Sequence, residues 1–533
     1  RQYETLSTEQ QRQLFVAAFG NSNRNPAPYM DEKNPVWQIN TDWQDLATRT
    51  ANRQSYSFNM SGGSDKNQYS MSASYMDRAG IVKNTDLKAY YFRLNNDAKL
   101  GERLKLSSNL SGSQQIQHVI DSDGWGGGLF GNLASQHTYT IPFDENGNLT
   151  GINTAADPYF GANSNPLIDL FLPSRLAKTT RLLGSMKADL TILKGLTLSA
   201  NLGADLTLDK NDNYLPVYKI GLLSRAIGST TVMNSQQTNW VGDITALYER
   251  NWKKHDLKLL TGFSIQSFNQ QSSAITGTGT VDNNLDQLNN QTTFSATGNS
   301  ISSGLVSTFA RLNYGFDSRY LFTATVRRDG SSKFGPSNRY GTFPSASLAW
   351  RISKEHFFTS KLVNDLKVRT SYGLTGNQNI GDFAYVTRTV ADPYVYGNVV
   401  VPGNSPANMS NPFLKWESAK QFDVGFDIAL LNNRINLTVD YYDKRSEGLL
   451  VRTPVPFTAS VSESPTRNIG SVKNTGTEIA LSTQNLIGDF KWSTDFNLSF
   501  NKNKVLNIGT NSAGDPLQIP GMIMPLPNEN ANL

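Results

Sequence analysis

The stretch of residues 320–358 reads YLFTATVRRDGSSKFGPSNRYGTFPSASLAWRISKEHFF. It holds two runs in which apolar and polar side chains alternate, 320–328 and 345–351, separated by a turn segment rich in Gly, Ser and Lys. A strand points successive side chains to opposite faces, so each run has one apolar and one polar face. The stretch therefore predicts two amphipathic strands joined by a loop.

The same period of two recurs along nearly the whole chain, with little helical pattern to cover the apolar faces. The clearest pair is 182–192 and 196–206, joined at Lys194 and Gly195. We count about sixteen such strands, mostly ten to fourteen residues long, and one short helix within 9–19. This pattern predicts an all-β fold in which the strands follow one another as an antiparallel meander.

The connections between the predicted strands alternate between short and long. The long ones are 77–88, 116–178, 210–237, 269–302, 330–342, 375–417 and 446–474. Alternate connections of a meander lie at the same end of the sheet, so one end carries tight turns and the other carries loops. Outer-membrane barrels have this asymmetry, and a tilted strand crosses the bilayer in roughly 9–11 residues. We therefore predict a transmembrane meander β-barrel.

A soluble β-sandwich, solenoid or propeller is the structural alternative. Sandwich strands are usually shorter, about 5–6 residues, and the chain shows no fixed repeat of about 20–50 residues. A transmembrane helix is not expected, because no window approaches roughly 18 uninterrupted apolar residues.

The alternation also predicts which side chains face lipid. A Lys or Arg on the lipid face near the bilayer centre costs about 2–4 kcal/mol, so the charged positions must face the lumen. The residues that we expect to face the lumen are Lys187, Asp189 and Asn201. The residues that we expect to face lipid are Leu182, Met186, Ala188, Leu190, Leu198 and Leu202.

Several motifs are similar to those of one known family. They include RDGSSKFG at 328–335, NRYG at 338–341, SYGLTGNQNIG at 371–381, NPFLKWESAKQFDVGFD at 411–427 and NIGSVKNTGTEIAL at 468–481. In collinear order from about residue 40 to 509, the sequence resembles the SusC/RagA branch of TonB-dependent outer-membrane transporters.

The resemblance implies a 22-stranded barrel, an N-terminal plug, a TonB-contacting segment before the plug, and a surface lipoprotein of the SusD type that captures glycans or peptides. About 16 of the 22 strands are expected in this chain, so we expect a partial barrel whose first and last strands do not pair. Residues 1–50 are then an extracellular segment before the strands, 51–509 the barrel, and 510–533 the start of an extracellular loop.

The sequence offers no catalytic constellation, metal site or cofactor motif. The four His residues are scattered, no G-x-S-x-G elbow is present, and the chain has no Cys. Residues 121–124 begin like a calcium loop but lack the downstream Glu, and 142–148 are most simply an acidic turn. Positive and negative residues are interspersed, which is not the pattern of a nucleic-acid site. We expect no enzyme activity, no cofactor and no nucleic-acid partner.

Two sets of loop residues are candidates for substrate or partner contact. The charged set lies around the loop between the predicted strands 320–328 and 345–351. It consists of Arg328, Asp329, Lys333 and Arg339. It either forms a solvated hairpin tip or contacts a plug or substrate. The aromatic set consists of Trp125, Phe130, Tyr139, Tyr159, Phe160, Tyr394 and Tyr396. Those rings either stack on sugars, enter a lipoprotein interface, or pack the loops together.

Three functions remain open on the sequence. The first is active import of glycan or peptide oligomers through the outer membrane of a Gram-negative, Bacteroidetes-like cell, with a SusD-like lipoprotein and the TonB complex as partners. The second is a passive porin, and the third is a β-rich surface binding protein. Loop geometry and the partner are expected to determine which substrate is taken.

Overall fold

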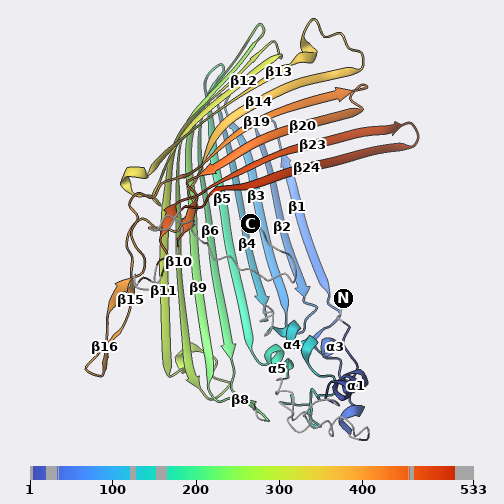
Figure 1. Ribbon diagram of the computed structural model, residues 1–533, viewed down its shortest axis with the longest axis vertical. Coiled ribbons are helices and arrows are strands. Elements are labelled where there is room, and N and C mark those ends of the chain that lie inside the picture. Colours follow the sequence, from blue (N-terminus) through green and yellow to red (C-terminus); the bar gives the residue numbers. More distant parts are fainter. Residues whose placement is uncertain are drawn as a thin grey trace.

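One antiparallel sheet of sixteen strands forms most of the molecule (Figure 1). The computed structural model describes residues 4–19, 33, 35–120, 128–151, 165–221, 223–453, 455, 461 and 463–509. Each main strand pairs with the main strand before it and after it in the chain, which confirms the predicted all-β meander and the count of sixteen.

The strands of the main sheet are β1 (Arg53–Gly63), β2 (Asn67–Ala79), β3 (Asp86–Leu100), β4 (Leu104–His118), β5 (Ser174–Leu193), β6 (Leu196–Leu215), β9 (Gly228–Trp252), β10 (His255–Thr280), β11 (Thr293–Phe316), β12 (Tyr320–Ser331), β13 (Tyr340–Arg351), β14 (Val363–Asn377), β19 (Glu417–Leu430), β20 (Ile435–Glu447), β23 (Ser471–Ile487) and β24 (Lys491–Asn507). Small two-stranded sheets in the loops pair β7 (Tyr218–Ile220) with β8 (Leu223–Arg225), β15 (Thr389–Ala391) with β18 (Asn404–Pro406), β16 (Tyr394–Tyr396) with β17 (Val399–Val401), and β21 (Leu450–Arg452) with β22 (Thr466–Asn468).

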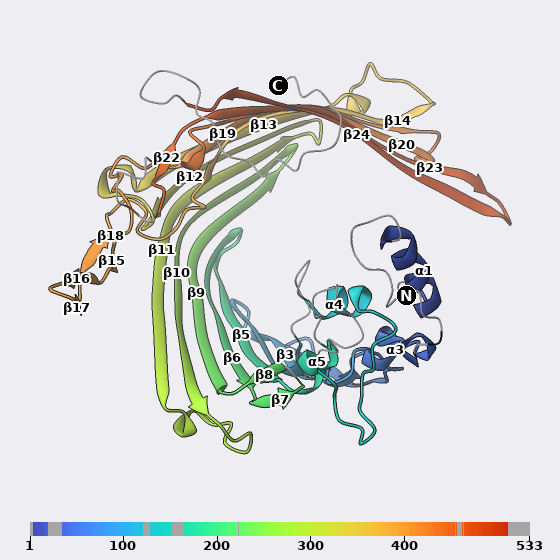
Figure 2. The same ribbon diagram turned by 60° about the horizontal axis from the view of Figure 1, so that its bottom comes forward.

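The sheet curves strongly but does not close (Figure 2). In the described part of the chain, β1 pairs only with β2 and β24 pairs only with β23. The expected lack of pairing between the first and last strands is therefore confirmed.

The short and long connections lie at opposite ends, as the sequence predicts. The turn between β5 and β6 is Lys194 and Gly195, and Gly195 has a φ of +87°. A Cβ there would also stand 2.3 Å from the backbone oxygen of Glu249, so this turn requires glycine. The loop end carries the connections 119–173, 378–416 and 448–470.

The strand lengths differ from the prediction in the middle of the sheet. Strands β5, β6, β9, β10 and β11 have 20, 20, 25, 26 and 24 residues, so they fill much of the expected loops 210–237 and 269–302. Polar residues occupy both faces of these strand extensions, as in QQ at 236–237 and NQQSS at 269–273. Without an apolar face the period-two signal disappears, although the backbone ladder continues.

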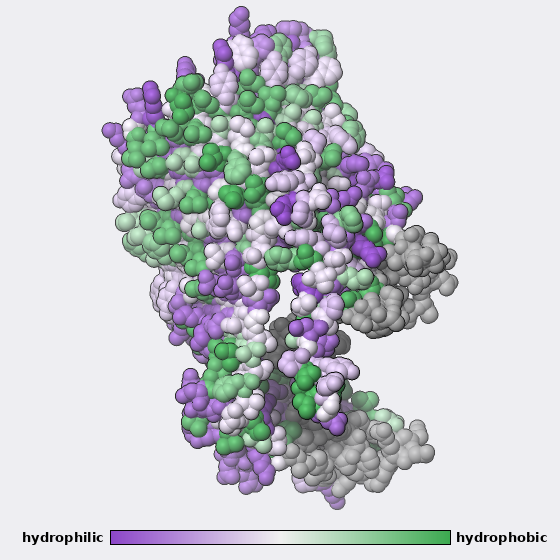
Figure 3. Space-filling model, turned by 90° about the vertical axis from the view of Figure 1, so that its left-hand side faces the viewer, coloured by the Kyte–Doolittle hydropathy of each residue, from purple (hydrophilic) through white to green (hydrophobic). Residues whose placement is uncertain are grey.

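The register aligns the apolar positions of all sixteen strands on one face, which we call the outer face. One cross-strand row on that face contains Met186, Leu202, Gly242, Ile265 and Val306. Met186 and Leu202 are 64% and 60% exposed. Seen from the side of β11 and β12, hydrophobic residues gather mostly over the upper half of the molecule (Figure 3).

The opposite face, which we call the concave face, is polar. Lys187 and Asp189 lie on it and form an ion pair of 2.8 Å, and Asn201 is the cross-strand partner of Lys187. The predicted division of these residues from Leu182, Met186, Ala188, Leu190, Leu198 and Leu202 is confirmed. A single cavity contacts this face on every strand from β3 to β11 of the main sheet, which places it on the inside of the curve.

The helices gather at the loop ends of the first strands (Figure 1). They are α1 (Thr8–Phe19), the 3-10 turn η1 (Pro35–Gln38), α3 (Trp43–Ala47), α4 (Leu129–Ser135) and α5 (Leu167–Phe171). Shorter 3-10 turns are η2 (Leu288–Asn290), η3 (Pro336–Asn338) and η4 (Ile352–Lys354). No helix among the described residues is long and apolar enough to cross a membrane.

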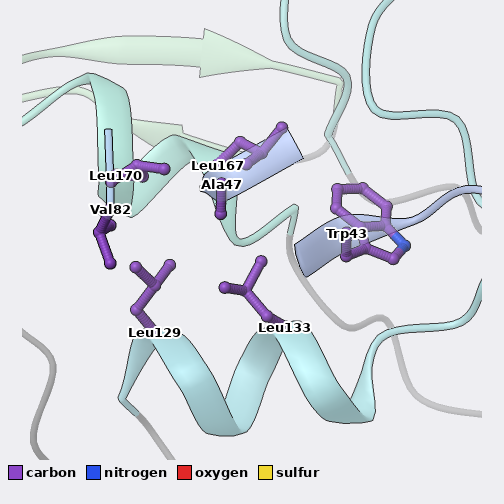
Figure 4. Packing of buried hydrophobic residues seen from close by; sticks show 7 residues of the cluster. All are labelled: Trp43, Ala47, Val82, Leu129, Leu133, Leu167 and Leu170. Atoms are coloured by element: carbon purple, nitrogen blue, oxygen red, sulfur yellow. The ribbon is translucent and has the colours of Figure 1, made fainter. Parts of the chain in front are cut away.

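A small core fixes α3, α4 and α5 together. Its buried residues are Trp43, Ala47, Val82, Leu129, Leu133, Leu167 and Leu170 (Figure 4). Asp42 caps α3 by accepting a hydrogen bond from the backbone N–H of Asp45 at 2.9 Å. Segments far apart in the sequence thus form one compact body at the loop end.

Candidate functional site

The concave face holds a cavity of about 820 Å³ near the middle of the sheet. Residues on β3 to β11 line it, together with Lys333 and Gln378 from two loops. Amide and hydroxyl side chains such as Asn109, Asn201 and Gln266 point into it beside apolar ones, which are Leu183, Val241, Phe268 and Leu305. A wall of this kind offers many weak hydrogen-bonding positions along a path and no reactive centre.

Hydrogen bonds hold the polar side chains of this wall in place. Arg181 binds both carboxylate oxygens of Asp205, at 2.9 and 2.6 Å. Asp243 accepts from the amide of Asn201 at 3.0 Å and from the hydroxyl of Ser264 at 2.6 Å. The wall is therefore ordered before any ligand arrives, and its charges are largely neutralised in pairs.

A second network lies on the concave face of β14, β19 and β20. Asp427 is 2.9 Å from Nζ of Lys367 and 3.3 Å from Nε of Arg369, while Arg369 also donates to Asp440 at 2.7 Å. A Cβ on Gly425 would stand 2.3 Å from the Asp440 carboxylate, so the glycine makes room for this network. Four charged groups on three strands are thereby joined on the inside of the curve.

The structure separates the predicted charged set. Asp329 is 8% exposed and pairs on the concave face with Arg327, a residue outside the predicted set, at 2.7 Å. Arg328 lies on the outer face, with its guanidinium 4.9 Å from the centre of the Tyr340 ring. Arg327 is two residues before Asp329, and residues two apart on a strand point to the same face. The alternation could therefore have identified Arg327.

Lys333 occupies the most distinctive position of the charged set. Its Nζ donates to the backbone oxygen of Ile380 at 3.0 Å and lies 3.7 Å from Oδ1 of Asp382. That Oδ1 atom is buried and accepts no hydrogen bond within the described structure. Lys333 lines both the concave cavity and a second cavity of about 660 Å³ among the loops, so it stands where the two meet.

A loop core holds Lys333 there. The next residue, Phe334, is fully buried and packs with Ile380, Leu414 and Trp416. The indole N–H of Trp416 donates to the backbone oxygen of Arg339 at 3.1 Å, which brings the last member of the charged set into the same cluster.

The aromatic set has mixed positions. Tyr139 is fully buried against Phe15, Trp37 and His137, so its ring packs the loop body. Phe130 is 42% exposed on α4. Tyr394 and Tyr396 are 69% and 75% exposed on the β16–β17 hairpin. Trp125, Tyr159 and Phe160 lie outside the described residues.

The β16–β17 hairpin projects from the body of the molecule (Figures 1 and 2). Besides the two tyrosines it exposes Val395, Val399 and Val400 by 59%, 61% and 69%. An isolated two-stranded hairpin is only marginally stable in water. Exposed apolar patches such as the one on this hairpin mark interaction surfaces.

Only some of the candidate metal ligands lie in the described part of the chain. No group of three or more His, Asp or Glu side chains there is placed to hold a metal ion. In the acidic turn 142–148, backbone and side-chain hydrogen bonds from Asn148 hold the pKa of Asp144 below its usual range. This carboxylate is satisfied by its own turn, and residues 121–124 lie outside the described residues.

Comparison of sequences identifies relatives over most of the chain. The family model described as TonB dependent receptor-like, beta-barrel, matches residues 124–533. TonB-dependent receptor P3 of Formosa agariphila is 31% identical over 479 residues, which cover 88% of this chain and 47% of the relative. TonB-dependent receptor SusC of Bacteroides thetaiotaomicron is 30% identical over 537 residues, which cover 95% of this chain and 51% of the relative. The chain spans about half the length of the curated relatives it matches.

Solved structures share the fold. The RagAB peptide transporter superposes with a TM-score of 0.81 at 24% identity, covering 94% of this chain and 58% of the other. The RagAB peptide importer in its closed-closed state gives 0.78 at 25% identity, covering 93% and 56%.

Proposed function

The chain belongs to the TonB-dependent receptor family, and from that premise we propose that it forms part of the wall of an outer-membrane importer for nutrient oligomers. The observation that carries the proposal is the division of the sheet into two continuous faces. The outer face is apolar along the rows around Met186, and the concave face carries the paired charges and the 820 Å³ cavity. A sheet of this kind separates lipid from a polar path.

The import is proposed to be active, driven through the TonB complex. Part of the barrel alone would leave an open sheet edge in lipid. The backbone N–H and C=O groups of that edge would lack hydrogen-bond partners, which is unfavourable in lipid. We therefore propose that the wall functions within the complete protein. A closed sixteen-stranded pore, the basis of the porin alternative, requires β1 to pair with β24, and neither strand does so here. Catalysis is not part of the proposal.

The proposed cargo is a glycan or peptide oligomer. The name of the RagAB peptide transporter motivates the peptide, and the resemblance to the SusC/RagA branch implies a glycan or a peptide. The amides of the wall can hydrogen-bond either cargo. Of the predicted contact residues, Lys333 is the one that we propose to meet the cargo, because it stands between the two cavities.

The proposed partner is a SusD-like surface lipoprotein, docked on the β16–β17 hairpin. Tyr and other aromatic residues dominate the energetics of many interfaces, and here two of them stand exposed beside three valines. Replacing Tyr394 and Tyr396 by Ala in the complete protein should weaken co-purification of the lipoprotein by about 30-fold in affinity, from a loss of roughly 2 kcal/mol. The control is Phe490→Ala, which removes a ring of 70% exposure at the opposite end of the sheet. Equal binding by the tyrosine variant and the control would exclude this docking site.

Uptake in the native host tests the function itself. A strain that lacks the complete gene should lose uptake of labelled oligomers from the outer medium, and a protonophore should abolish the uptake in the parent strain. A passive porin predicts uptake that continues when the proton gradient is removed, and a surface binding protein predicts binding without any internalised label.

A further inference from the structure

The cavity of about 660 Å³ among the loops, which we call the loop cavity, joins segments that lie far apart in the sequence. It is lined by residues 299–301 at the loop end of β11, by 380–384 in the connection after β14, by 463–466 at the start of β22, and by Lys333. The connection after β14 contributes two adjacent side chains of different chemistry, Asp382 and Phe383. These two side chains carry the inference.

Asp382 lacks the hydrogen-bond donors that a nearly buried carboxylate needs. Its side chain is 12% exposed, and its Oδ1 atom accepts no hydrogen bond from the described residues. Nζ of Lys333 lies 3.7 Å from that atom, which is beyond hydrogen-bonding distance, and donates instead to the backbone oxygen of Ile380. A donor that a ligand brings to this carboxylate is therefore strongly favoured.

Phe383 is held in a conformation that bulky residues rarely adopt. Its φ is +57°, in the left-handed region. The residue is 45% exposed, and its backbone oxygen accepts a hydrogen bond from the N–H of Val386 at 3.1 Å. Residues strained in this way cluster at sites that bind ligands, and this one places an apolar ring beside a carboxylate.

The cations of the loop cavity give less reason to expect an anionic ligand. Lys333 donates to the backbone oxygen of Ile380, and Arg388 forms an ion pair with Glu463. Arg452 is exposed on β21, where water solvates it. What the cavity offers a ligand is thus a carboxylate short of donors, which favours a ligand rich in O–H or N–H groups.

A sugar hydroxyl fits this arrangement better than a peptide group. A hydroxyl accepts and donates at one atom, so it can accept from Lys333 and donate to Asp382 at the same time. In a peptide group the N–H only donates and the C=O only accepts. A pyranose ring also has a face of C–H groups, which can pack on the ring of Phe383.

We propose that Asp382 and Phe383 form a subsite for one pyranose unit of a glycan cargo, with hydroxyls on the Asp382 carboxylate and the C–H face on the Phe383 ring. The inference rests on the proposed function, because it assumes that the complete protein imports an oligomer. It goes further, since it selects a glycan over a peptide. Lys333 lines both the loop cavity and the concave cavity, so a unit bound here lies at the entrance to the polar path.

Binding to the complete protein, purified in detergent with any lipoprotein that accompanies it, tests the proposal. The probes are an array of short linear oligosaccharides and a pool of short peptides from digested casein. At least one oligosaccharide should bind. Its per-O-methylated form should not, because methyl ethers keep the acceptors and the ring but cannot donate to Asp382.

Two variants locate the binding. Asp382→Asn should lower the affinity for the bound oligosaccharide about tenfold, because hydrogen bonds to a charged acceptor are lost. Phe383→Asn should also lower it about tenfold, because the ring is removed. The unfolding temperature of Phe383→Asn should stay the same or rise, since Asn adopts the left-handed region more readily than Phe.

The matched controls are Asp392→Asn and Phe413→Ala. They remove an exposed carboxylate and a ring of 79% exposure from the same connection, and neither residue lines the loop cavity. Both controls should bind the oligosaccharide as the parent does.

Unchanged affinity in either subsite variant, equal binding of the methylated oligosaccharide, or an array on which no oligosaccharide binds would overturn the proposal, whether or not the peptides bind. If the native host still takes up a labelled oligomer in a way that a protonophore stops, only this inference fails. If the complete gene supports no uptake of any oligomer, the proposed function fails with it.

Discussion

A single charge placed on the outer face measures directly which side of the sheet meets lipid. Met186 is 64% exposed in the middle of the apolar band, between Leu190 and Leu182 on the same face of β5. Its cross-strand partners on that face are Ser108 and Leu202, so an arginine at this position finds no carboxylate beside it. The polar rim at Thr180 is six residues away, about 20 Å along the strand, beyond the reach of a snorkelling side chain.

Met186→Arg should therefore cost the full penalty of a midplane charge, about 2–4 kcal/mol, or roughly a 30- to 700-fold change in the folding equilibrium. The matched control is Ser185→Arg, one residue earlier on the concave face, where the side chain enters the 820 Å³ cavity. That change loses a 3.3 Å hydrogen bond from Asn109 and should stay within about 0.5–1 kcal/mol.

The assay is a urea titration of the complete protein refolded into lipid vesicles, with both variants measured beside the parent. The expected result is a lowered midpoint for Met186→Arg and little change for Ser185→Arg. If the two variants lose equal stability, or if Ser185→Arg loses more, the assignment of the outer face to lipid is wrong.

Two further predictions concern the ends of the sheet. Phe334→Ala should remove about 3–5 kcal/mol of local stability from the loop core, because the ring is fully buried, and segment 378–416 should become protease-sensitive; Phe413→Ala, which removes a ring of 79% exposure, should not have this effect. At the turn end, the hydrogen bond from the hydroxyl of Tyr320 is the main cause that holds the pKa of Glu355 below its ordinary 4.5. The carboxylate form is therefore favoured in the folded state. Its contribution to the stability of the turn is present above pH 4.5 and is lost as the pH falls through the lowered pKa. The protection factors of the backbone amides in 352–362, each taken relative to the intrinsic exchange rate at that pH, should fall over that acidic range in the parent. Glu355→Gln should have lower protection factors at neutral pH and no further fall in acid; an identical acid-dependent fall in both would refute the role of this carboxylate.

The strand pattern was predictable wherever one face of a strand is apolar. Leu182 to Leu190 and Leu198 to Leu206 alternate with polar residues, and the structure pairs them as β5 and β6 with those faces aligned. The prediction was wrong where both faces are polar. Residues 228–237 and 269–280 were expected in loops, but they extend β9 and β10, since backbone hydrogen bonds to neighbours sustain a strand without an apolar face.

The candidate site was predictable only in part, because its geometry depends on contacts between distant segments. The motif around Lys333 marks a loop, but the position of Lys333 between two cavities depends on Phe334 packing with Ile380 and Leu414. The predicted contact residues included Arg328 and Asp329 but not Arg327, which pairs with Asp329 in the structure. The burial of Tyr139 follows from contacts with Phe15 and Trp37, more than a hundred residues earlier in the chain.

The all-β meander, the number of strands, the end that carries the loops and the two faces of each strand follow from the sequence, because they depend on local alternation and on the length of each connection. Which polar groups contact one another depends on the folded sheet. The register placed Lys178 directly opposite Lys210 and joined Arg369 to two aspartates on other strands. A strand can slide along its neighbour in steps of two residues without exchanging its faces, so alternation alone leaves the cross-strand partners open, and the ladder of the folded sheet fixes them.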